Sequence, residues 1–530
     1  VADHVGRLAA GLRDAGVKRG DRVLLRLGNE PLLAFSFFAC LSVGAVAIPV
    51  SGQLTGNEVA RVMADATPAV ALTDPALPLP LPIKIPAECV CIDANRFWRA
   101  SKALPPRGPV ACPADTGAYL VYTSGTTAAP KGVLHAHRAV WGRAPMYQGW
   151  YGLRADDCVL HAGALNWTYT LGTGLMDPWA HGATAAIVTG HAALDADLWP
   201  GVIETHGATI FAAVPGIFRR LARTSATAAL GKLDRFRHGL TAGDRLPSAV
   251  HAGWTSATGK PLYQALGMSE LSTFISFGPN VPAEVISSHP EATGIAQPGR
   301  RVAVLSESDF EAGRLTVLAD LASASPQTDE TPRAKPGSAK PGSANPKPMQ
   351  TSLRPAHANA TATVEPVCGL LAVHRSDPGL MLGYWQRPQE EAAVLHGDWF
   401  VGGDRVSVNV AGIVTHLGRT SDVMNAQGYR VSPLEVEAVI GDVLGVQELA
   451  VTEWAVRDDV TVIAGFIVAQ SDGALDEVAL FNALTTATRR LAAYKRPKTW
   501  RLVTALPRTA NGKIQRRALA SLQSRALTTP

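Results

Sequence analysis

The chain has 530 residues, of which 47% are apolar and 18% are charged. This composition is typical of a globular protein and excludes a mainly disordered or collagen-like chain. The 49 Lys and Arg residues against 44 Asp and Glu leave a net charge of +5, which is too small in a chain of this length to indicate a nucleic-acid-binding face.

The six cysteines are scattered along the chain, and only Cys89 and Cys91 are close to one another. Scattered cysteines favour buried thiols in a reducing compartment over a disulfide framework, and C-x-C alone is not a zinc spacing. We therefore predict a cytoplasmic protein. The sequence opens on Val1-Ala2 with helical spacing already under way, so we expect it to begin inside a domain whose first elements are missing.

Residues 31–50 carry no charge and are long enough to imitate a membrane span. Pro31, Gly44 and Pro49 divide the stretch, so we predict a helix to about Val43 and then a short buried strand. Further buried strands are predicted at 22–27, 69–73, 118–122, 184–189 and 209–214, with a helix at 216–223. Strands that alternate with helices indicate an α/β fold with a largely parallel sheet covered on both faces.

Residues 321–366 interrupt this pattern, because they are rich in proline, repeat the sequence AKPGS and lack aromatic side chains. Such a segment buries too little apolar surface to offset its ordering entropy, and we predict a flexible insertion. A strand pattern resumes after Gly369, and from about Thr420 a pattern of helix, two strands and helix predicts a small α+β domain. The predicted domains are therefore 1–418 and 419–530.

The segment Tyr122–Gly132, YTSGTTAAPKG, follows a predicted strand and combines small residues, hydroxyls and a lysine. Small residues let backbone N–H groups approach a phosphate, hydroxyls add donors and lysine adds charge. It differs from a Walker A loop, since Pro130 and Gly132 flank the lysine. The sequence predicts a phosphate-binding loop made of Thr123, Ser124, Gly125, Thr126, Thr127 and Lys131.

This segment resembles the phosphate-binding loop of the adenylate-forming (AMP-binding) superfamily, and specifically its acyl-CoA synthetase and benzoate–CoA ligase branch. Further motifs follow in the family's order: 239–244 (GLTAGD), 265–270 (ALGMSE), 398–404 (DWFVGGD), 418–437 and 507–517 (PRTANGKIQRR). The resemblance implies a large multi-layer N-terminal domain with mixed, largely parallel sheets and a small mobile α+β C-terminal domain. It also implies ATP, Mg²⁺ and coenzyme A, with a carboxylic acid as substrate.

The resemblance also implies roles for individual residues of these motifs. Glu270 would hold Mg²⁺, Asp404 would accept hydrogen bonds from the ribose, Arg419 would reach the ribose or a phosphate, and Lys513 would steady the carboxylate and the α-phosphate. Lys513, Glu270, Arg419 and Thr126 form the implied catalytic set. The other implied nucleotide-binding residues are Ala242, Gly243, Asp244, Ala265, Leu266, Gly267, Met268, Ser269 and Arg430.

The small domain is expected to swing about a hinge at Ser421. By the same resemblance, Gly428 and Arg430 would then line the tunnel for the pantetheine of CoA. As a further hypothesis, acetylation of Lys513 would remove its charge and block adenylation.

The acid pocket implied by the resemblance involves Asn166, Trp167, Tyr169, Val214 and Gly267. Acetate-activating relatives carry Trp near the position of Gly267, so the glycine predicts an acid larger than acetate. Trp167 and Tyr169 would pack against a ring or a medium acyl chain, and an aromatic or alicyclic acid is slightly favoured over a medium-chain fatty acid.

The resemblance predicts an acid–CoA ligase that forms an acyl-adenylate and then the thioester, releasing pyrophosphate and AMP. Two alternatives stay open: an adenylation module that loads a carrier protein, and a catalytically degraded nucleotide-binding relative. Nucleic-acid partners and a membrane span are not expected, and the oligomeric state is left open, with a homodimer among the alternatives.

Overall fold

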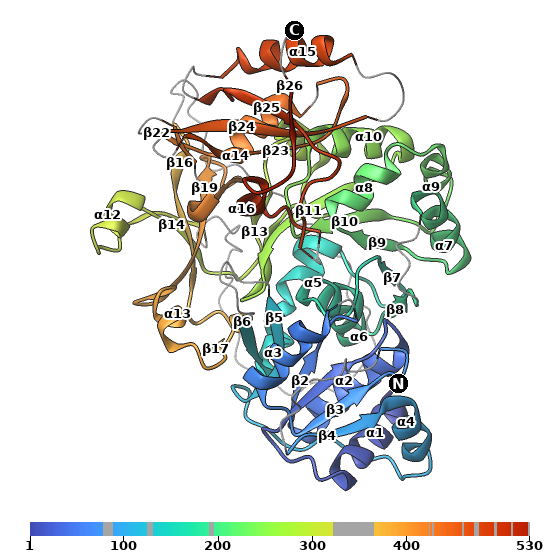
Figure 1. Cartoon of the computed structure of the whole chain (residues 1–530). Coiled ribbons are helices and arrows are strands. Elements are labelled where there is room, and N and C mark those ends of the chain that lie inside the picture. The colour runs from blue at the N-terminus through green and yellow to red at the C-terminus, as the bar shows by residue number, and fades with distance from the viewer. Residues whose placement is uncertain are drawn as a thin grey trace, which may run out of the picture.

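Figure 1 shows the computed structural model of the chain, which describes residues 1–52, 54–77, 88–123, 131–189, 195–321, 365–422, 424–426, 429–441, 443–457, 460–470, 476–491, 495–509 and 512–527. A large N-terminal domain contains three sheets, and a smaller C-terminal domain (orange to red) lies at the opposite end of the molecule from the first sheet (blue). The predicted α/β fold with a large and a small domain is confirmed.

The first sheet has seven strands in the order β17 (Gly383–Tyr384), β6 (Lys131–Ala136), β5 (Gly117–Thr123), β2 (Val46–Pro49), β1 (Arg22–Arg26), β3 (Val70–Thr73) and β4 (Val90–Asp93). Neighbouring strands from β5 to β4 pair in parallel, while β6 and β17 are antiparallel additions. One face packs against α1 (Ala2–Asp14), α2 (Pro31–Val43) and α4 (Ala94–Ser101), and the other packs against α3 (Gly56–Ala66).

Local signals explain the ends of two of these helices. Pro31 occupies the first turn of α2, and Gly44 ends that helix in the left-handed conformation with φ 76°, which glycine adopts at little cost. Thr55 and Glu58 form a capping box at the start of α3. The predicted helix and strand within residues 31–50 are therefore confirmed, and no helix in the described part of the chain is long and apolar enough to cross a membrane.

The second sheet also has seven strands, in the order β13 (Ile295–Ala296), β12 (Ser272–Ser276), β11 (Leu262–Met268), β10 (His238–Ala242), β9 (Ile210–Ala213), β7 (Cys158–His161) and β8 (Thr184–Ile187). The strands from β11 to β8 are parallel, and β12 and β13 are antiparallel. Helices α7 (Trp199–Thr205), α8 (Pro215–Leu221), α9 (Ala228–Gly231) and α10 (Ser248–Thr258) cover one face. The short helix α11 (Ala283–Ser288) and the π-helical turn η3 (Tyr147–Tyr151) pack on the other.

Three short helical segments fill the space between the first two sheets: α5 (Thr168–Leu171), η4 (Gly172–Met176) and α6 (Asp177–His181). Leu171, Leu175 and Met176 join the same apolar core as α1 and α2. This arrangement places α5 against both sheets and next to the start of β12.

The strand predicted at 184–189 is shorter and less buried than expected. It forms β8, which lies at the edge of the second sheet, with Thr184 exposed and Ala185, Ala186 and Ile187 half-buried. An edge strand has a neighbour on one side only, and an apolar run does not reveal which strand will be at the edge. The strands predicted at 22–27, 69–73, 118–122 and 209–214 and the helix at 216–223 are confirmed as β1, β3, β5, β9 and α8.

The third sheet is antiparallel, with the order β15 (Val317–Asp320), β14 (Val302–Leu305), β16 (Val367–His374), β19 (Trp399–Val408) and β18 (Leu395–His396), and with β20 (Val414–Arg419) also paired to β19. Short helices α12 (Glu307–Glu311) and α13 (Pro388–Ala392) flank it. The predicted insertion falls between β15 and β16, and its residues 322–364 lie outside the described part of the chain.

The small domain contains the hairpin β21 (Met424–Ala426) and β22 (Tyr429–Val431) and a sheet in the order β23 (Val446–Arg457), β24 (Val460–Ala469), β25 (Thr499–Leu502) and β26 (Arg525–Leu527). Helices α14 (Pro433–Ile440) and α15 (Glu477–Thr488) pack in one core, and α16 (Arg516–Leu519) packs in a second core. The predicted α+β order is confirmed, whereas the boundary after residue 418 stays a prediction.

Candidate active site

A cavity of about 710 Å³ lies where the small domain meets the large one. Its walls come from the facing ends of β5 and β6, from α5, β10, β11 and β12, and from Thr509 and residues 513–518 of the small domain. The predicted site residues that line it are Thr123, Lys131, Trp167, Tyr169, Ala242, Gly243, Gly267, Met268, Ser269, Glu270, Arg419 and Lys513. Motif residues that are far apart in the sequence thus converge on one space.

A smaller cavity of about 90 Å³ adjoins the first and shares Gly243, Gly267, Arg419 and Lys513 with it. The other predicted residues around it are Asp244, Ala265, Leu266 and Asp404. All of the implied nucleotide-binding residues whose side chains are described therefore border one or both cavities.

Asp404 sits on β19 with only 4% of its surface exposed. His416 Nε2 donates to Asp404 Oδ1 over 2.9 Å, and Arg419 Nε lies 3.4 Å from the same oxygen. Burial alone would raise the pKa of Asp404, but Arg419, the hydrogen bond from His416 and the charge of Lys513 together hold that pKa well below its usual range. The carboxylate is therefore an ionised hydrogen-bond acceptor at neutral pH.

Glu270 is held by a tyrosine from another sheet. The Tyr384 hydroxyl on β17 donates to Glu270 Oε1 over 2.7 Å, and burial together with the Glu270 charge raises the pKa of Tyr384 far above its usual value. Lys131 Nζ lies 4.0 Å from the centre of the Tyr384 ring and 2.8 Å from Glu390 Oε2. Tyr384 thus contacts the cation of Lys131 through its ring and the carboxylate of Glu270 through its hydroxyl.

The side chain of Lys513 borders both cavities from a short turn of the small domain. Thr509 and Lys513 pair through their backbones (N···O 2.8 Å), and Gly512 between them has φ 82°, a conformation that favours glycine. Arg508 Nη1 donates to the Gly512 carbonyl over 2.6 Å. These contacts fix the backbone of Lys513 while its exposed ammonium reaches toward Asp404.

One glutamate joins the two domains near this turn. Glu448 on β23 accepts from Arg219 Nη1 of the large domain over 3.3 Å and from Arg508 Nη2 over 2.9 Å. Arg245 of the large domain also donates to the Leu434 carbonyl over 2.9 Å. We call Arg219, Glu448 and Arg508 the interdomain ion bridge; it supports the position in which Lys513 borders the cavity.

The large cavity also has aromatic lining residues. The rings of Trp167 and Tyr169 meet edge to face with centroids 5.4 Å apart, and the Tyr169 hydroxyl donates to the Leu240 carbonyl over 3.2 Å. Gly243 has φ 93°, and a Cβ there would lie 2.8 Å from Trp167 and 4.0 Å from Val214. The glycine therefore lets the indole lie against the backbone at the end of β10, and this wall suits a flat apolar group.

The place of two predicted members of the acid pocket stays a prediction. Asn166 and Val214 are not among the residues that border either cavity, and Val214 packs against the same apolar core as Trp167. Asn166 precedes the first turn of α5 and is half-buried outside the cavity wall. Motif spacing places a residue near a pocket but does not say on which side of a turn it points.

The structure also changes the reason for expecting an acid larger than acetate, which was based on Gly267. A Cβ at this position would lie 2.7 Å from the Ser272 carbonyl oxygen and 2.8 Å from Thr273 Cα on the neighbouring strand. A side chain there would strike β12 unless the strand moved, because β11 carries a register shift between Leu266 and Gly267. Gly267 is thus required by strand packing, and the size of the cavity itself is the better ground for an acid larger than acetate.

Some predicted residues fall outside what the structure describes. Ser124, Gly125, Thr126 and Thr127 belong to such a segment, and so does Gly428. Ser421 lies in the 3-10 turn η8 (Thr420–Asp422), and Arg430 lies in β22, with only the backbone described for both. Their assigned roles stay predictions.

Comparison with models of known protein families identifies the family of this chain. The family model described as AMP-binding enzyme matches residues 1–317, and the model of its C-terminal domain matches residues 435–513. The chain belongs to the AMP-binding enzyme family. The family predicted from the sequence motifs is therefore confirmed.

Several relatives of this AMP-binding enzyme are named as CoA ligases of aromatic acids. It is 27% identical over 537 residues to the 3-hydroxybenzoate–CoA ligase of Aromatoleum sp. (strain CIB), covering 98% of this chain and 90% of that protein. It is 28% identical over 533 residues to the benzoate–CoA ligase of Thauera aromatica, with the same two shares. The solved structure of the anthranilate CoA ligase AuaEII with anthranoyl-AMP has a TM-score of 0.77 at 24% identity, covering 98% and 90% of the two chains.

Members of this family use Mg²⁺, so its site can be tested against the residues present. Within the described residues, no group of three or more His, Cys, Asp or Glu gathers as a metal site. Glu270 and Asp422 are the carboxylates among the described residues that border the large cavity, and one oxygen of Glu270 is hydrogen-bonded to Tyr384. Mg²⁺ commonly binds through one or two carboxylates plus substrate phosphates, so the site of this AMP-binding enzyme fits an ion held jointly with the nucleotide.

Sequence reasoning missed three polar residues of the site. Tyr384 lies 114 positions from the Glu270 that it binds, and His416 reaches Asp404 only through the pairing of β19 and β20. Arg516 borders both cavities and makes two hydrogen bonds, of 2.5 and 2.9 Å, to the buried Glu437. His416 and Arg419 lie three residues apart on β20, but no strand was predicted there from the sequence.

Proposed function

We propose that this AMP-binding enzyme is an AMP-forming aryl-CoA ligase, which activates an aromatic carboxylic acid with ATP and transfers the acyl group to CoA. The observation that carries the proposal is one cavity that is lined by cations and carboxylates and also by the aromatic pair Trp167 and Tyr169. The names of its relatives support aromatic acids, and the volume of about 710 Å³ leaves room for a ring beside a nucleotide.

In the first half-reaction a carboxylate oxygen of the acid attacks the α-phosphorus of ATP, and pyrophosphate leaves. Negative charge on the phosphate oxygens is the quantity to be stabilised, so preorganised cations dominate the rate. Lys131, Arg419 and Lys513 all border the cavity. Mg²⁺ held at Glu270 would neutralise charge on the phosphates. Asp404 would accept from the ribose hydroxyls and fix the nucleotide.

In the second half-reaction the CoA thiolate attacks the acyl carbonyl, the bond from that carbonyl to the phosphate oxygen breaks, and AMP leaves. The phosphate of AMP takes up the electron pair of the broken bond, and we propose that Lys513 is not needed for this step because the small domain carries it away from the cavity. We propose that the small domain turns about Ser421 between the two steps, which would part the interdomain ion bridge and bring Gly428 to the cavity. The scattered free cysteines support a reducing cytoplasm as the place of action.

The proposal is tested by measuring AMP release with ATP, Mg²⁺ and CoA across acetate, octanoate, cyclohexanecarboxylate, benzoate and hydroxybenzoates. We expect CoA-dependent AMP release with aromatic acids and little with acetate. Acyl-AMP formation that CoA fails to discharge would instead favour a carrier-loading module. ATP binding without AMP release from any aromatic acid would contradict the proposal.

Replacing Glu448 by glutamine should weaken the interdomain ion bridge while keeping its shape. Both of its arginine contacts involve side chains about three-quarters shielded from solvent, so we expect adenylation to slow roughly 3- to 10-fold. Thioester formation from preformed acyl-AMP should stay constant or rise, because that step does not need this domain position. Pyrophosphate exchange and single-turnover thiolation measure the two steps separately.

Glu284→Gln on α11 is the matched control for that experiment, since Glu284 is an exposed side chain of the large domain. It should alter neither half-reaction. Equal slowing of both half-reactions in Glu448→Gln would mean that Glu448 supports folding rather than the adenylating position.

Replacing Asp404 by asparagine should raise the KM for ATP. The substitution removes an ionised acceptor that His416 and Arg419 hold in place, and a hydrogen bond to a charged group is worth roughly 1.5–3 kcal/mol, or about 10- to 100-fold in affinity. The KM for the acid should change little. Steady-state kinetics with each substrate varied in turn checks this, and an unchanged KM for ATP would remove Asp404 from the nucleotide site.

A further inference from the structure

Ser272 is the first residue of β12 and one of the residues that border the large cavity. Its φ of 80° lies in the left-handed region, which is uncommon for a residue other than glycine. Backbone strain of this kind persists where the surroundings impose it, and it gathers at functional sites. The next residue, Thr273, borders the same cavity.

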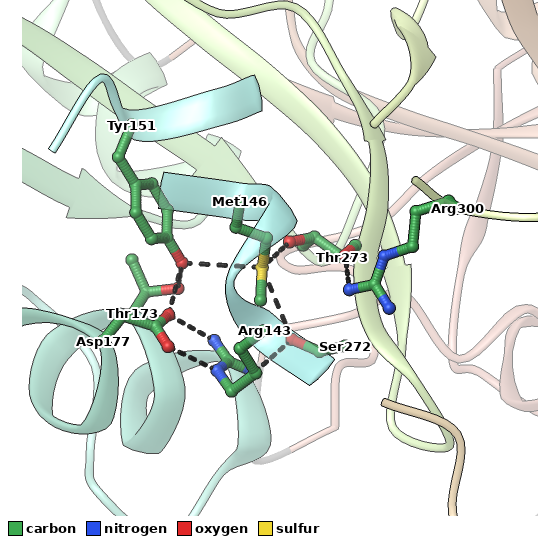
Figure 2. Close-up of polar contacts among 8 residues, drawn as sticks. All are labelled: Arg143, Met146, Tyr151, Thr173, Asp177, Ser272, Thr273 and Arg300. Carbon is green, nitrogen blue, oxygen red and sulfur yellow. Dashed lines mark hydrogen bonds and ion pairs between the residues drawn. The ribbon is translucent and has the colours of Figure 1, made fainter. Parts of the chain in front are cut away.

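The surroundings of Ser272 form a buried polar cluster, which Figure 2 shows. Arg143 and Asp177 are 3% and 0% exposed, and the guanidinium grips the carboxylate with two hydrogen bonds of 2.6 Å. The Tyr151 hydroxyl donates to the same carboxylate over 2.7 Å. The remaining terminal nitrogen of Arg143, Nη1, donates to Ser272 Oγ.

This arrangement decides what the Ser272 hydroxyl is able to do. A hydroxyl that accepts a hydrogen bond from a cation becomes a stronger donor, because the bonds of a chain polarise one another. Its own hydrogen meets only the Met146 sulfur, at an Oγ···Sδ distance of 3.9 Å. Thioether sulfur is a weak acceptor, and Thr273 Oγ1 already lies 2.6 Å from the same sulfur.

The Ser272 hydroxyl therefore has a polarised hydrogen without a good acceptor, at the wall of a substrate cavity. Trp167 and Tyr169, on or beside α5, line the same cavity, and α5 contacts β12. An aromatic acid that packs on these rings would present its ring edge toward β12. An oxygen on that edge would provide the acceptor that the protein lacks.

We propose that Ser272 is a specificity-determining residue that donates a hydrogen bond to a ring oxygen of the acid, and that the substrates are aromatic acids with a hydroxyl or alkoxy group. Arg143 is the positioning residue, since it acts through Ser272 and is itself neutralised by Asp177. This inference rests on the proposed aryl-CoA ligase function. It adds the chemical class of the ring substituent and the residue that reads it.

The wild-type enzyme alone gives the first test. AMP release is measured with benzoate and with the ortho, meta and para isomers of hydroxy-, methoxy- and methylbenzoate. We expect one position at which hydroxy and methoxy acids exceed the methyl acid of equal shape by about 10-fold or more in kcat/KM, as a lost hydrogen bond predicts. Methylbenzoates equal to or better than their oxygen analogues at every position would overturn the inference while leaving the ligase function intact. No release with any of these acids would instead overturn the proposed function.

The second test replaces Ser272 by alanine and by glycine, with Thr170→Val as the matched control. Thr170 is a buried hydroxyl on α5 that lacks a hydrogen-bond partner in the described structure, so valine removes no contact. In both Ser272 variants the ratio of kcat/KM for oxygen-bearing acids to kcat/KM for the methyl acids of equal shape should fall toward one, while the control keeps the wild-type ratio. Glycine also relieves the positive φ, so at least that variant should fold. A preference that survives in Ser272→Gly would overturn the assignment.

Discussion

Replacing Lys513 with alanine is expected to slow acyl-adenylate formation by roughly 100- to 1,000-fold, the usual effect of removing one preorganised group that stabilises transition-state charge. The structure supports this size of effect because the Lys513 ammonium borders both cavities and is aimed by the Thr509–Lys513 turn. Thioester formation from chemically prepared benzoyl-AMP should fall less than about 3-fold, since the proposed turn of the small domain removes Lys513 from the cavity before that step. Pyrophosphate exchange and single-turnover thiolation separate the two rates.

Lys495→Ala is the matched control, because Lys495 also belongs to the small domain but pairs with Glu435 away from the cavity lining. It should leave both rates unchanged. Loss of both half-reactions to the same extent in Lys513→Ala would show that the lysine maintains the fold of the small domain. In that case its placement at the cavity would have no catalytic meaning.

Replacing Asp177 with alanine is expected to lower the free energy of unfolding by about 3–5 kcal/mol, the cost of leaving one partner of a buried ion pair alone. Arg143 and Asp177 are almost completely shielded from solvent, so water cannot replace the lost carboxylate. Burial alone would lower the pKa of Arg143, but Asp177 holds that pKa above its usual value. The guanidinium also stays charged in the Asp177→Ala variant, because arginine does not lose its proton in proteins. Urea unfolding followed by intrinsic fluorescence measures the change.

Two comparisons make that result specific. Glu477→Ala breaks an exposed ion pair with Arg525 on the small domain and should hardly move the unfolding midpoint. The double variant Arg143→Met with Asp177→Leu removes both charges and should recover most of the stability lost in Asp177→Ala. A double variant as unstable as the single one would mean that packing volume, rather than an unpaired charge, sets the cost.

Local patterns made much of the fold predictable. The uncharged stretch 31–50 resolved into α2 and β2 because Pro31 and Gly44 carry conformational preferences of their own. Glu270, Asp404, Arg419 and Lys513 were found because each lies in a motif whose neighbours are also constrained. These features depend on a few consecutive residues, and a sequence displays such features directly.

Pairings between distant segments were not predictable. Nothing near Glu270 indicates that Tyr384 will bind it. Likewise, nothing near Arg143 indicates that it will bind Asp177 in α6 and Ser272 in β12. The same reason explains why the edge position of β8 and the tight packing of Gly267 against β12 were not predicted. Whether a strand is at an edge, or a glycine is required by a neighbouring strand, depends on neighbours that only the folded chain supplies.

The central claim, an acyl-adenylate route to an aryl-CoA, is tested most directly by following oxygen atoms. The enzyme is incubated with ATP, Mg²⁺, CoA and an aromatic acid whose two carboxyl oxygens are ¹⁸O, and the products are analysed by mass spectrometry. Attack of the carboxylate on the α-phosphorus predicts one ¹⁸O in each AMP and one in each acyl-CoA. Label in free phosphate together with ADP, or AMP without ¹⁸O, would contradict it.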